Sequence, residues 1–466
     1  MDDHRNPARS IDDFATWEPV LRLVRASREE RFAAPGAHVA GHIGRGGWSV
    51  PIKQGVSRTH RDEHDAVERV RDALAQDGID TVSFTVKVDP AGRALLRILD
   101  YGPAVEPGVG PHPGALVLVE GSLPQPWHRL PDAVPGALPA PSADPELLER
   151  TLRERLPGAV GATEAEIAAA ETRLGIALPD ELKALYRVTR SHWEDWQDDE
   201  EAARRQAEAV RCELFGLADL YVAEAATRYF LWRFAAMDAV DNRPDAAVQG
   251  LVGSPGWIVF GDNGGGDRLA VDLTPGPRGH TGQVIILSHE ESVGAGLVAD
   301  SLTDMMLDRR RRAESGLRGA GRQSPAVAWV NASSLRSLEA AADPGLEVVS
   351  IGVWNDPPLS LAPLIGLPRL RTLTAYPGTI ADPREIAELT GLEYLELAPR
   401  DWRVLLDAGA VPRGLLAASI KAGHDDDPLP VAALADELLA LWGRPPITRT
   451  ALTGDLGPVA DGLGDL

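Results

Sequence analysis

Apolar residues recur at helix and strand spacings along the first 122 residues. Val67, Val70 and Leu74 form the stripe of a predicted helix that ends at Gly78. Residues 82–88 then alternate apolar with polar side chains, which predicts a strand with one buried face. Further strands are expected at 96–98 and 116–119. The pattern predicts a small α+β domain, with the helix packed on an antiparallel meander of these three strands.

The middle of the chain begins with two predicted helices. Thr163 and Glu166 have the spacing of a capping box, in which each side chain bonds the other residue's backbone N–H, and Gly175 ends that helix. A second helix starts after Pro179. Residues 257–260 and 269–273 predict two strands joined by a glycine-rich turn, and 282–287 predicts another strand.

These two motifs carry a resemblance to a known family. The string Ala162-Thr163-Glu164 through Leu174-Gly175-Ile176-Ala177-Leu178-Pro179-Asp180-Glu181-Leu182 resembles the entry helices of the SUKH superfamily. The segment Phe260-Gly261-Asp262-Asn263-Gly264-Gly265-Gly266-Asp267, with Val271-Asp272, Pro275-Gly276-Pro277, Gly282-Gln283-Val284 and His289-Glu290, is similar to its central hairpin. The superfamily includes fungal cell-wall-synthesis regulators and bacterial immunity proteins. The resemblance covers roughly residues 155–312 and implies a mixed sheet flanked by helices that binds proteins and is not known as a catalyst.

The last part of the chain contains an internal repeat. Leu364, Leu367, Leu370, Leu373 and Ala375 recur 22 residues later as Ile386, Leu389, Leu392, Leu395 and Leu397. This spacing is similar to that of leucine-rich repeats, in which each turn adds one short strand to a parallel sheet. Leu370, Leu373, Leu392 and Leu395 are then expected in one core, whereas Arg371, Thr374, Glu393 and Glu396 are expected to face solvent. An apolar helix through residues 431–442 is expected to cap the stack.

Two stretches of unusual composition mark the expected domain boundaries. Seven prolines between residues 123 and 145 predict a stiff linker that makes few contacts, and the arginine and glycine residues after Asp308 predict a flexible joint. The expected architecture is α+β and multidomain. Its parts are an unassigned domain (1–122), a linker (123–150), a SUKH-like domain (151–312), a second linker (313–325) and a leucine-rich-repeat-like α/β solenoid (326–466).

Composition narrows the class of protein. The net charge of −22 over 466 residues argues against a general nucleic-acid binder. The single cysteine, Cys212, excludes an internal disulfide and any multi-cysteine metal site. We find no phosphate-binding Gly-x-x-x-x-Gly-Lys loop and no Gly-x-Ser-x-Gly elbow. No apolar run is long enough to span a membrane and the N-terminus has no secretory layout, so we expect a cytoplasmic protein without a cofactor.

One segment of the N-terminal region has the residue spacing of a metal-binding motif. His60, Glu63 and His64 have the His-x-x-Glu-His spacing of inverted zinc peptidases, in line with the helix stripe at Val67. A charged first turn of a helix produces the same pattern by chance, and no third ligand follows. We therefore expect no bound metal, and these three residues are the candidate ligands if one is bound.

The candidate contact site for a partner is acidic and carries aromatic residues. Exposed tryptophans beside carboxylates suit a basic protein partner, and a solvated loop is the alternative. The candidate residues are Trp193, Asp195, Trp196, Asp198, Asp199, Glu200, Glu201, Asp262 and Asp267. We therefore expect a non-enzymatic protein of the immunity type, which binds and neutralises a cognate toxin, a basic toxin domain being the expected partner. A regulatory scaffold that recruits partners through its SUKH-like and repeat domains is the alternative.

Overall fold

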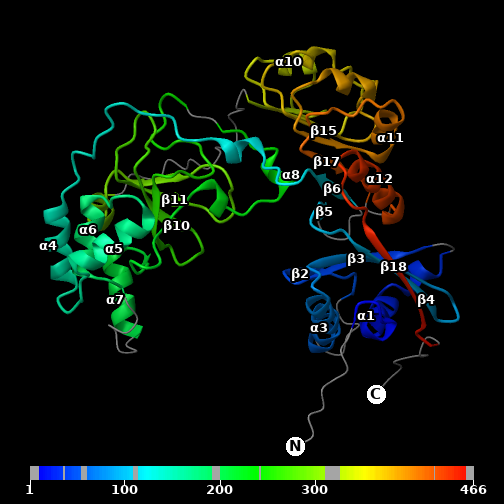
Figure 1. Ribbon diagram of the computed structural model, residues 1–466, viewed down its shortest axis with the longest axis horizontal. Coiled ribbons are helices and arrows are strands. Elements are labelled where there is room, and N and C mark those ends of the chain that lie inside the picture. The colour runs from blue at the N-terminus through cyan, green and yellow to red at the C-terminus, as the bar shows by residue number, and fades with distance from the viewer. Residues whose placement is uncertain are drawn as a thin grey trace, which may run out of the picture. The chain divides into compact units, whose positions relative to one another are not determined.

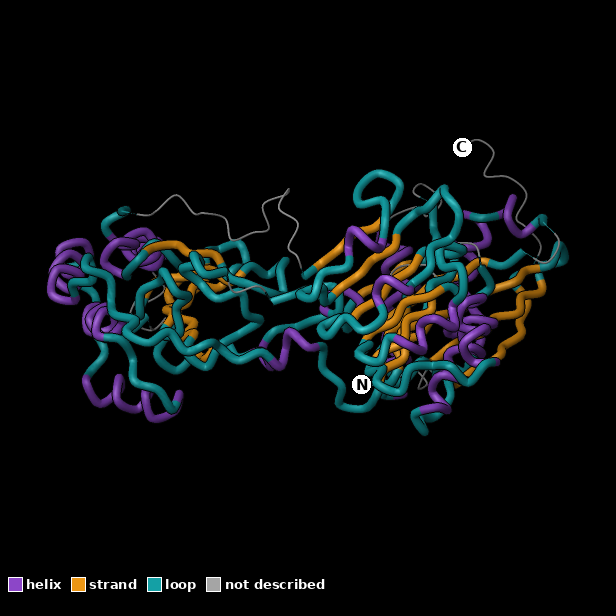
Figure 2. Tube along the Cα trace, turned by 90° about the horizontal axis from the view of Figure 1, so that it is seen from above, coloured by secondary structure: helices purple, strands orange, loops and turns teal. Residues whose placement is uncertain are grey.

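The computed structural model describes residues 10–34, 37–53, 60–108, 114–191, 200–240, 243–309, 326–423 and 426–457. It divides the chain into two compact units. Unit 1 contains Met1–Ser122, Trp329–Pro344 and Val349–Leu466, and unit 2 contains Leu123–Ala328 and Gly345–Val348. Figure 2 shows helices and strands mixed within each unit. No helix among these residues is long and apolar enough to cross a membrane.

Unit 1 begins with a helix-backed antiparallel sheet of strand order β18-β4-β3-β1-β2. Its elements are α1 (Phe14–Ser27), α2 (Glu29–Phe32), β1 (Val39–Gly44), β2 (Gly47–Ser49), α3 (His60–Asp77), β3 (Thr81–Val88), β4 (Arg93–Asp100) and β18 (Thr448–Asp455). Helices α1 and α3 cover one face of this sheet (Figure 1). Trp17 of α1 meets Phe84 of β3 edge-on at 5.3 Å between ring centroids, and both side chains are fully buried.

The second sheet of the chain has seven strands in the order β13-β14-β15-β16-β17-β6-β5. The strands are β5 (Val105–Pro107), β6 (Ala115–Leu118), β13 (Val327–Val330), β14 (Val348–Ile351), β15 (Thr372–Ala375), β16 (Tyr394–Leu397) and β17 (Ala417–Ile420). The helices between and after them are α10 (Leu338–Ala341), α11 (Pro399–Asp407) and α12 (Pro428–Leu441), with 3-10 turns at Ala362–Leu364 and Pro383–Glu388. Strands β15, β16 and β17 are parallel, and Leu373, Leu395 and Ala418 lie opposite one another. The residues aligned by the 22-residue spacing therefore share one register.

Within unit 1, the N-terminal and C-terminal parts of the chain each contribute one strand to a sheet formed mainly by the other part. Strand β6 does not continue the N-terminal meander but pairs antiparallel with β17. Conversely, the C-terminal strand β18 pairs along its whole length with β4, which Figure 1 shows as a red strand in the blue sheet. The predicted three-stranded meander is therefore wrong. The predicted helix through residues 431–442 is present as a helix at Pro428–Leu441, but strand β6 also covers the edge of the parallel strands at β17. The pattern at 115–118 identified a strand but not its partner, because strand pairing is not a local property.

The outer face of the parallel strands is also buried. Leu370, Leu373, Leu392 and Leu395 are buried as predicted, but Arg371, Thr374 and Glu396 are only 5%, 7% and 4% exposed and Glu393 is half-buried. The prediction that these four residues face solvent is therefore wrong. Polar side chains on this face bond to one another, which is what allows them to be buried.

Unit 2 is a three-layer arrangement around the sheet β12-β11-β10-β9-β7, with β8 also pairing β9. Its strands are β7 (Glu213–Leu214), β8 (Tyr221–Val222), β9 (Trp257–Asp262), β10 (Arg268–Asp272), β11 (Gln283–Leu287) and β12 (Gly296–Ala299). Its helices are α4 (Pro145–Arg155), α5 (Glu164–Leu174), α6 (Asp180–Val188), α7 (Glu200–Val210), α8 (Trp232–Ala235) and α9 (Leu302–Met306), with 3-10 turns at Gln125–His128 and Ala225–Thr227. Side chains of β9 alternate between two cores: Ile258 and Phe260 face the helices, and Trp257 and Val259 face the segment after β8. The predicted capping box of Thr163 and Glu166 starts α5.

The proline-rich stretch is packed onto unit 2. Asp132 and Gln249 exchange two hydrogen bonds of 2.8 and 2.9 Å, and the Thr281 N–H donates to the Leu138 carbonyl at 3.1 Å. Trp127 is 5% exposed and packs against Phe230 with the two rings tilted and their centroids 4.5 Å apart. The expectation of a linker with few contacts is therefore wrong. Prolines exclude regular pairing, but their neighbours still bond the domain surface.

A buried carboxylate joins three segments of unit 2. Asp272 accepts hydrogen bonds from the Trp257 indole (3.0 Å), the Gln283 amide (2.9 Å) and the Thr274 N–H (2.8 Å). Burial raises the pKa of Asp272 to about 6, and these hydrogen bonds oppose the rise.

This raised pKa predicts a pH-dependent stability. Because the folded pKa lies above the unfolded value of 3.8, the folded state binds the Asp272 proton more tightly. The stabilisation is complete below about pH 4 and is lost as the pH rises to about 6, by about 3 kcal/mol for a shift of about two units. Urea unfolding of the parent and of Asp272→Asn at several pH values measures it. The difference between their unfolding free energies should fall across this window, and a difference that is independent of pH would contradict the assignment.

Candidate functional site

The hairpin turn between β9 and β10 uses the two carboxylates that were candidates for partner contact. Asp262 is 6% exposed, accepts the Gly264 N–H at 2.6 Å and pairs with Arg268. Gly264 and Gly266 have φ of 81° and 99°, a backbone conformation that favours glycine and that accounts for the glycine-rich turn. Asp262 therefore holds the turn and offers little surface to a partner.

Asp267 is also engaged within the turn. It accepts the His289 backbone N–H at 3.0 Å, and its carboxylate lies 2.8 Å from the His289 ring. The bond from the His289 backbone, followed by those from the His289 and Asn263 side chains, lowers the pKa of Asp267. The His289-Glu290 pattern therefore contributes to the fold of the hairpin through its histidine.

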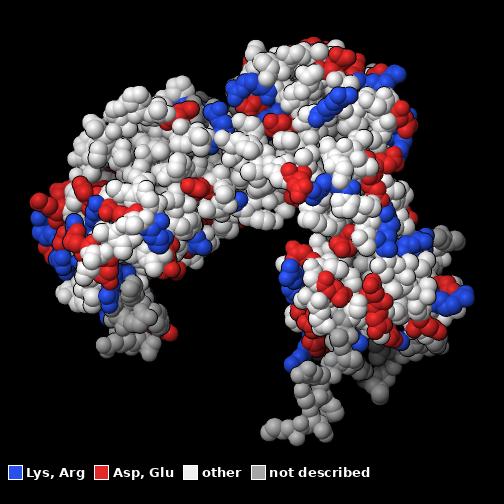
Figure 3. Space-filling view, viewed as in Figure 1, with Lys and Arg blue, Asp and Glu red and all other residues white. Residues whose placement is uncertain are grey.

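The acidic candidate segment is described only at its end. Trp193, Asp195, Trp196, Asp198 and Asp199 lie outside the described residues. Glu200 and Glu201 begin α7, where Glu201 pairs with Arg204 at 2.7 Å. Arg204 also pairs with Glu208 at 3.0 Å. Figure 3 shows acidic and basic side chains intermixed over the helical end of unit 2, so the acids of α7 are partly neutralised within their own helix.

The metal pattern falls on the first turns of α3. Glu63 is half-buried, and His64 is exposed and lies 3.9 Å from Glu68. The side chain of His60 lies outside the described residues. In the described part of the chain, no three histidine, cysteine or acidic side chains come together as a metal site.

An aromatic segment that the sequence patterns did not single out stands on the surface of unit 2. Tyr229 and Phe234 are 82% and 58% exposed, the highest values among the described aromatic residues with large exposed surfaces. They flank Phe230, which packs against Trp127, and Trp232, which is buried. We call residues 228–236 the aromatic segment.

The aromatic segment is fixed by hydrogen bonds and packing contacts with the rest of unit 2. The Arg228 guanidinium donates to the backbone carbonyls of Ser288 (3.3 Å) and Glu291, and burial lowers its pKa. Ala235 packs with Trp127 and Val252 in a small core. A fixed segment that exposes large aromatic side chains has the properties of a protein-contact hot spot. Four aromatic residues in the six positions 229–234 were the available sequence signal.

A second candidate surface consists of two aromatic rings that stay partly exposed beside the buried polar groups of the parallel strands. Thr374 donates to Ser350 at 2.9 Å, and Ser419 donates to Glu396 at 3.2 Å. Lys421 pairs with Glu396 at 3.2 Å and lies over the Tyr376 ring at 5.6 Å. Trp329 and Tyr376 remain 46% and 42% exposed. The surface thus combines fixed polar groups with partly exposed aromatic rings.

Fold and surfaces together define unit 2 as an α+β domain suited to contact with another protein. Residues 161–308 match the SMI1/KNR4 family (SUKH-1) and form a domain of that family. The resemblance carried by the entry helices and the hairpin is thereby confirmed.

Three curated fungal proteins illustrate the similarity. The chain is 33% identical over 105 residues to a "Glucan synthesis regulatory protein" of Neurospora crassa, which covers 21% of this chain and 19% of that protein. It is 27% identical over 164 residues to the "Cell wall biosynthesis/cell cycle regulator smi1" of Schizosaccharomyces pombe, covering 31% and 30%. It is 44% identical over 50 residues to a "KNR4/SMI1 homolog" of Yarrowia lipolytica, covering 11% and 7%. The chain thus spans less than a third of each of these relatives.

Proposed function

We propose that this protein is a non-enzymatic regulatory protein that acts by binding a partner protein through its SUKH-1 domain. The observation that carries the proposal is the match of residues 161–308 to a family whose curated relatives are named as regulators. Those names favour the regulatory scaffold over the toxin-neutralising function that we expected first. The fixed aromatic segment supports a contact with protein.

The partner surface that we propose is centred on Tyr229 and Phe234. Burying two such rings releases much apolar surface from water, and the fixed segment loses little conformational entropy on binding. The acidic candidates from Trp193 to Glu201 remain a second proposal, for a basic partner.

The expected result is that Tyr229→Ser/Phe234→Ser loses the partner. Truncating a hot-spot residue costs about 2 kcal/mol or more, so the double variant should weaken binding by at least about 100-fold. The partner would be isolated from the native cell on the full chain, and its affinity for the purified variants then measured by calorimetry.

The matched control is Leu138→Ser/Val160→Ser, which removes exposed apolar side chains elsewhere in unit 2 (70% and 45% exposed). It should bind like the parent. If the partner binds the aromatic variant as tightly as it binds the parent chain, this surface is excluded as the contact. Charge reversal at Glu200 and Glu201 is then the next test. Failure of the full chain to retain any partner specifically would contradict the proposed function itself.

We also propose that the parallel strands of unit 1 are leucine-rich repeats and that the partly exposed aromatic rings beside them recruit a second partner. The common register of Leu373, Leu395 and Ala418 supports the repeat assignment. The exposed rings of Trp329 and Tyr376 support a contact surface.

A further inference from the structure

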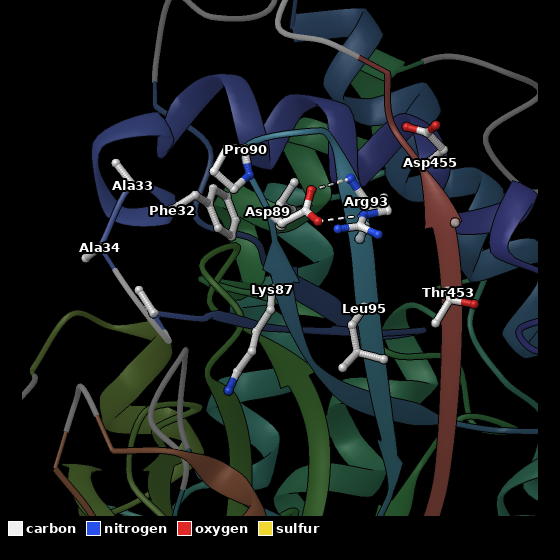
Figure 4. Close-up of a pocket in the computed structure, with 14 residues that line it drawn as sticks. Phe32, Ala33, Ala34, Lys87, Asp89, Pro90, Arg93, Leu95, Thr453 and Asp455 are labelled. Carbon is white, nitrogen blue, oxygen red and sulfur yellow. Dashed lines mark hydrogen bonds and ion pairs between the residues drawn. The ribbon is translucent and has the colours of Figure 1, made fainter.

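Unit 1 contains a cavity of about 880 Å³ outside both candidate surfaces. Its floor is the outer face of β3, β4 and β18, and one wall is Phe32 of α2 with Ala33, Ala34 and Ala37 (Figure 4). The lining is largely apolar and includes Phe32, Ala34, Pro90 and Leu95. This volume lies within the roughly 300–1,000 Å³ typical of small-molecule sites.

One cation in this cavity has no acid to pair with. Lys87 is half-buried and, within the described residues, its ammonium group takes part in no hydrogen bond or ion pair. The chain has four lysines, and Lys183 and Lys421 each pair with a glutamate. Figure 4 shows the Lys87 side chain extending away from the Asp89–Arg93 pair.

The strand register places Lys87 within an apolar and hydroxyl-bearing row. Lys87 lies opposite Leu95, and Leu95 lies opposite Thr453. Arg97, on the same face two residues after Leu95, is a diagonal neighbour of Lys87 and likewise has no partner within the described residues. Arg97 does not line the cavity, so Lys87 is the unpaired cation of the floor and lies next to an apolar wall.

The two acids of the lining each have a hydrogen-bond partner other than Lys87. Asp89 accepts both the backbone N–H of Arg93 (3.0 Å) and its guanidinium (2.7 Å). Asp455 accepts the Gly457 N–H at 2.7 Å. An isolated cation beside apolar walls favours a ligand with a single negative charge and an apolar body.

We propose that this cavity binds an amphipathic organic anion, with its carboxylate at Lys87 and its apolar body against Phe32, Ala34 and Leu95. A straight-chain carboxylic acid of about ten carbons is the probe that matches this chemistry. Unit 1 would then have a small-molecule binding site that is separate from the proposed protein contacts of unit 2.

Calorimetric titration of the full chain with decanoate, below its micelle concentration, tests the proposal. Decanoate should bind the parent, and decanol at least about 10-fold more weakly, because the alcohol lacks the charge. Lys87→Gln should weaken decanoate binding by about 10-fold or more. Ala34→Trp, which adds bulk at an exposed wall position, should block both ligands.

The matched control is Lys53→Gln, which removes an exposed lysine outside the cavity lining and should leave decanoate binding unchanged. Melting temperatures equal to the parent would show that the variants remain folded. The proposal is overturned if decanoate does not bind, if decanol binds as tightly, or if Lys87→Gln and Ala34→Trp both bind like the parent.

Discussion

Leu392→Asp should unfold the parallel strands of unit 1. Leu392 is fully buried, and its N–H donates to the Leu389 carbonyl at 3.3 Å in the turn that leads into β16. The substitution removes packed apolar atoms and buries a carboxylate without a partner, at a cost of at least about 4 kcal/mol. Urea unfolding of the full chain, followed by tryptophan fluorescence, should show the unit 1 transition at a much lower urea concentration.

The strand exchange makes the expected effect reach further than one repeat. β17 holds β6 from the N-terminal part of the chain, and β18 completes the N-terminal sheet beside β4. Damage around β16 should therefore also expose the N-terminal sheet to protease, whereas unit 2 stays protected. Persistence of a protected N-terminal sheet would show that the two sheets unfold independently.

Ile365→Asp is the matched control, because Ile365 is 42% exposed and lies in the segment before β15. The same new charge at that position can remain hydrated, so the loss should be about 1 kcal/mol or less. If Leu392→Asp unfolds like this control, the repeat register is wrong.

Local sequence signals predicted local structure well in this protein. The capping box of Thr163 and Glu166 and the turn after Phe260 each depend on residues within a few positions of one another. The 22-residue spacing likewise placed Leu373 opposite Leu395, because a repeat fixes its own register.

Features that depend on distant partners could not be predicted in the same way. Nothing within residues 115–118 says that their partner lies near residue 418. Glu396 is a polar residue at an alternating position and was expected in solvent, yet Lys421 and Ser419 satisfy it on a buried face. The site residues Tyr229 and Phe234 follow no helix or strand period, so their exposure required the fold.

Glu181 provides the second large expected effect. It is an acidic residue in the first turn of α6, yet it is 6% exposed. Its carboxylate accepts the backbone N–H groups of Leu302 (3.2 Å) and Thr303 (3.0 Å) at the start of α9 and the Thr303 hydroxyl (2.5 Å). It also accepts the N–H of Asp144, the N-cap of α4, at 3.3 Å. One side chain thus joins three helices of unit 2, namely α4, α6 and α9.

Glu181→Ala should therefore lower the unfolding free energy of unit 2 by about 3–5 kcal/mol, because several buried donors lose their acceptor and cannot reach water. Glu181→Gln keeps the shape and one acceptor oxygen, so its loss should be smaller. Asp180→Ala is the control: Asp180 precedes Glu181 in the sequence and is exposed, so the expected change is about 0.5 kcal/mol, from the helix dipole alone. Equal losses for the two alanine variants, measured by urea unfolding, would mean that the Glu181 carboxylate contributes only as a charge in the first turn of α6 and does not join the helices.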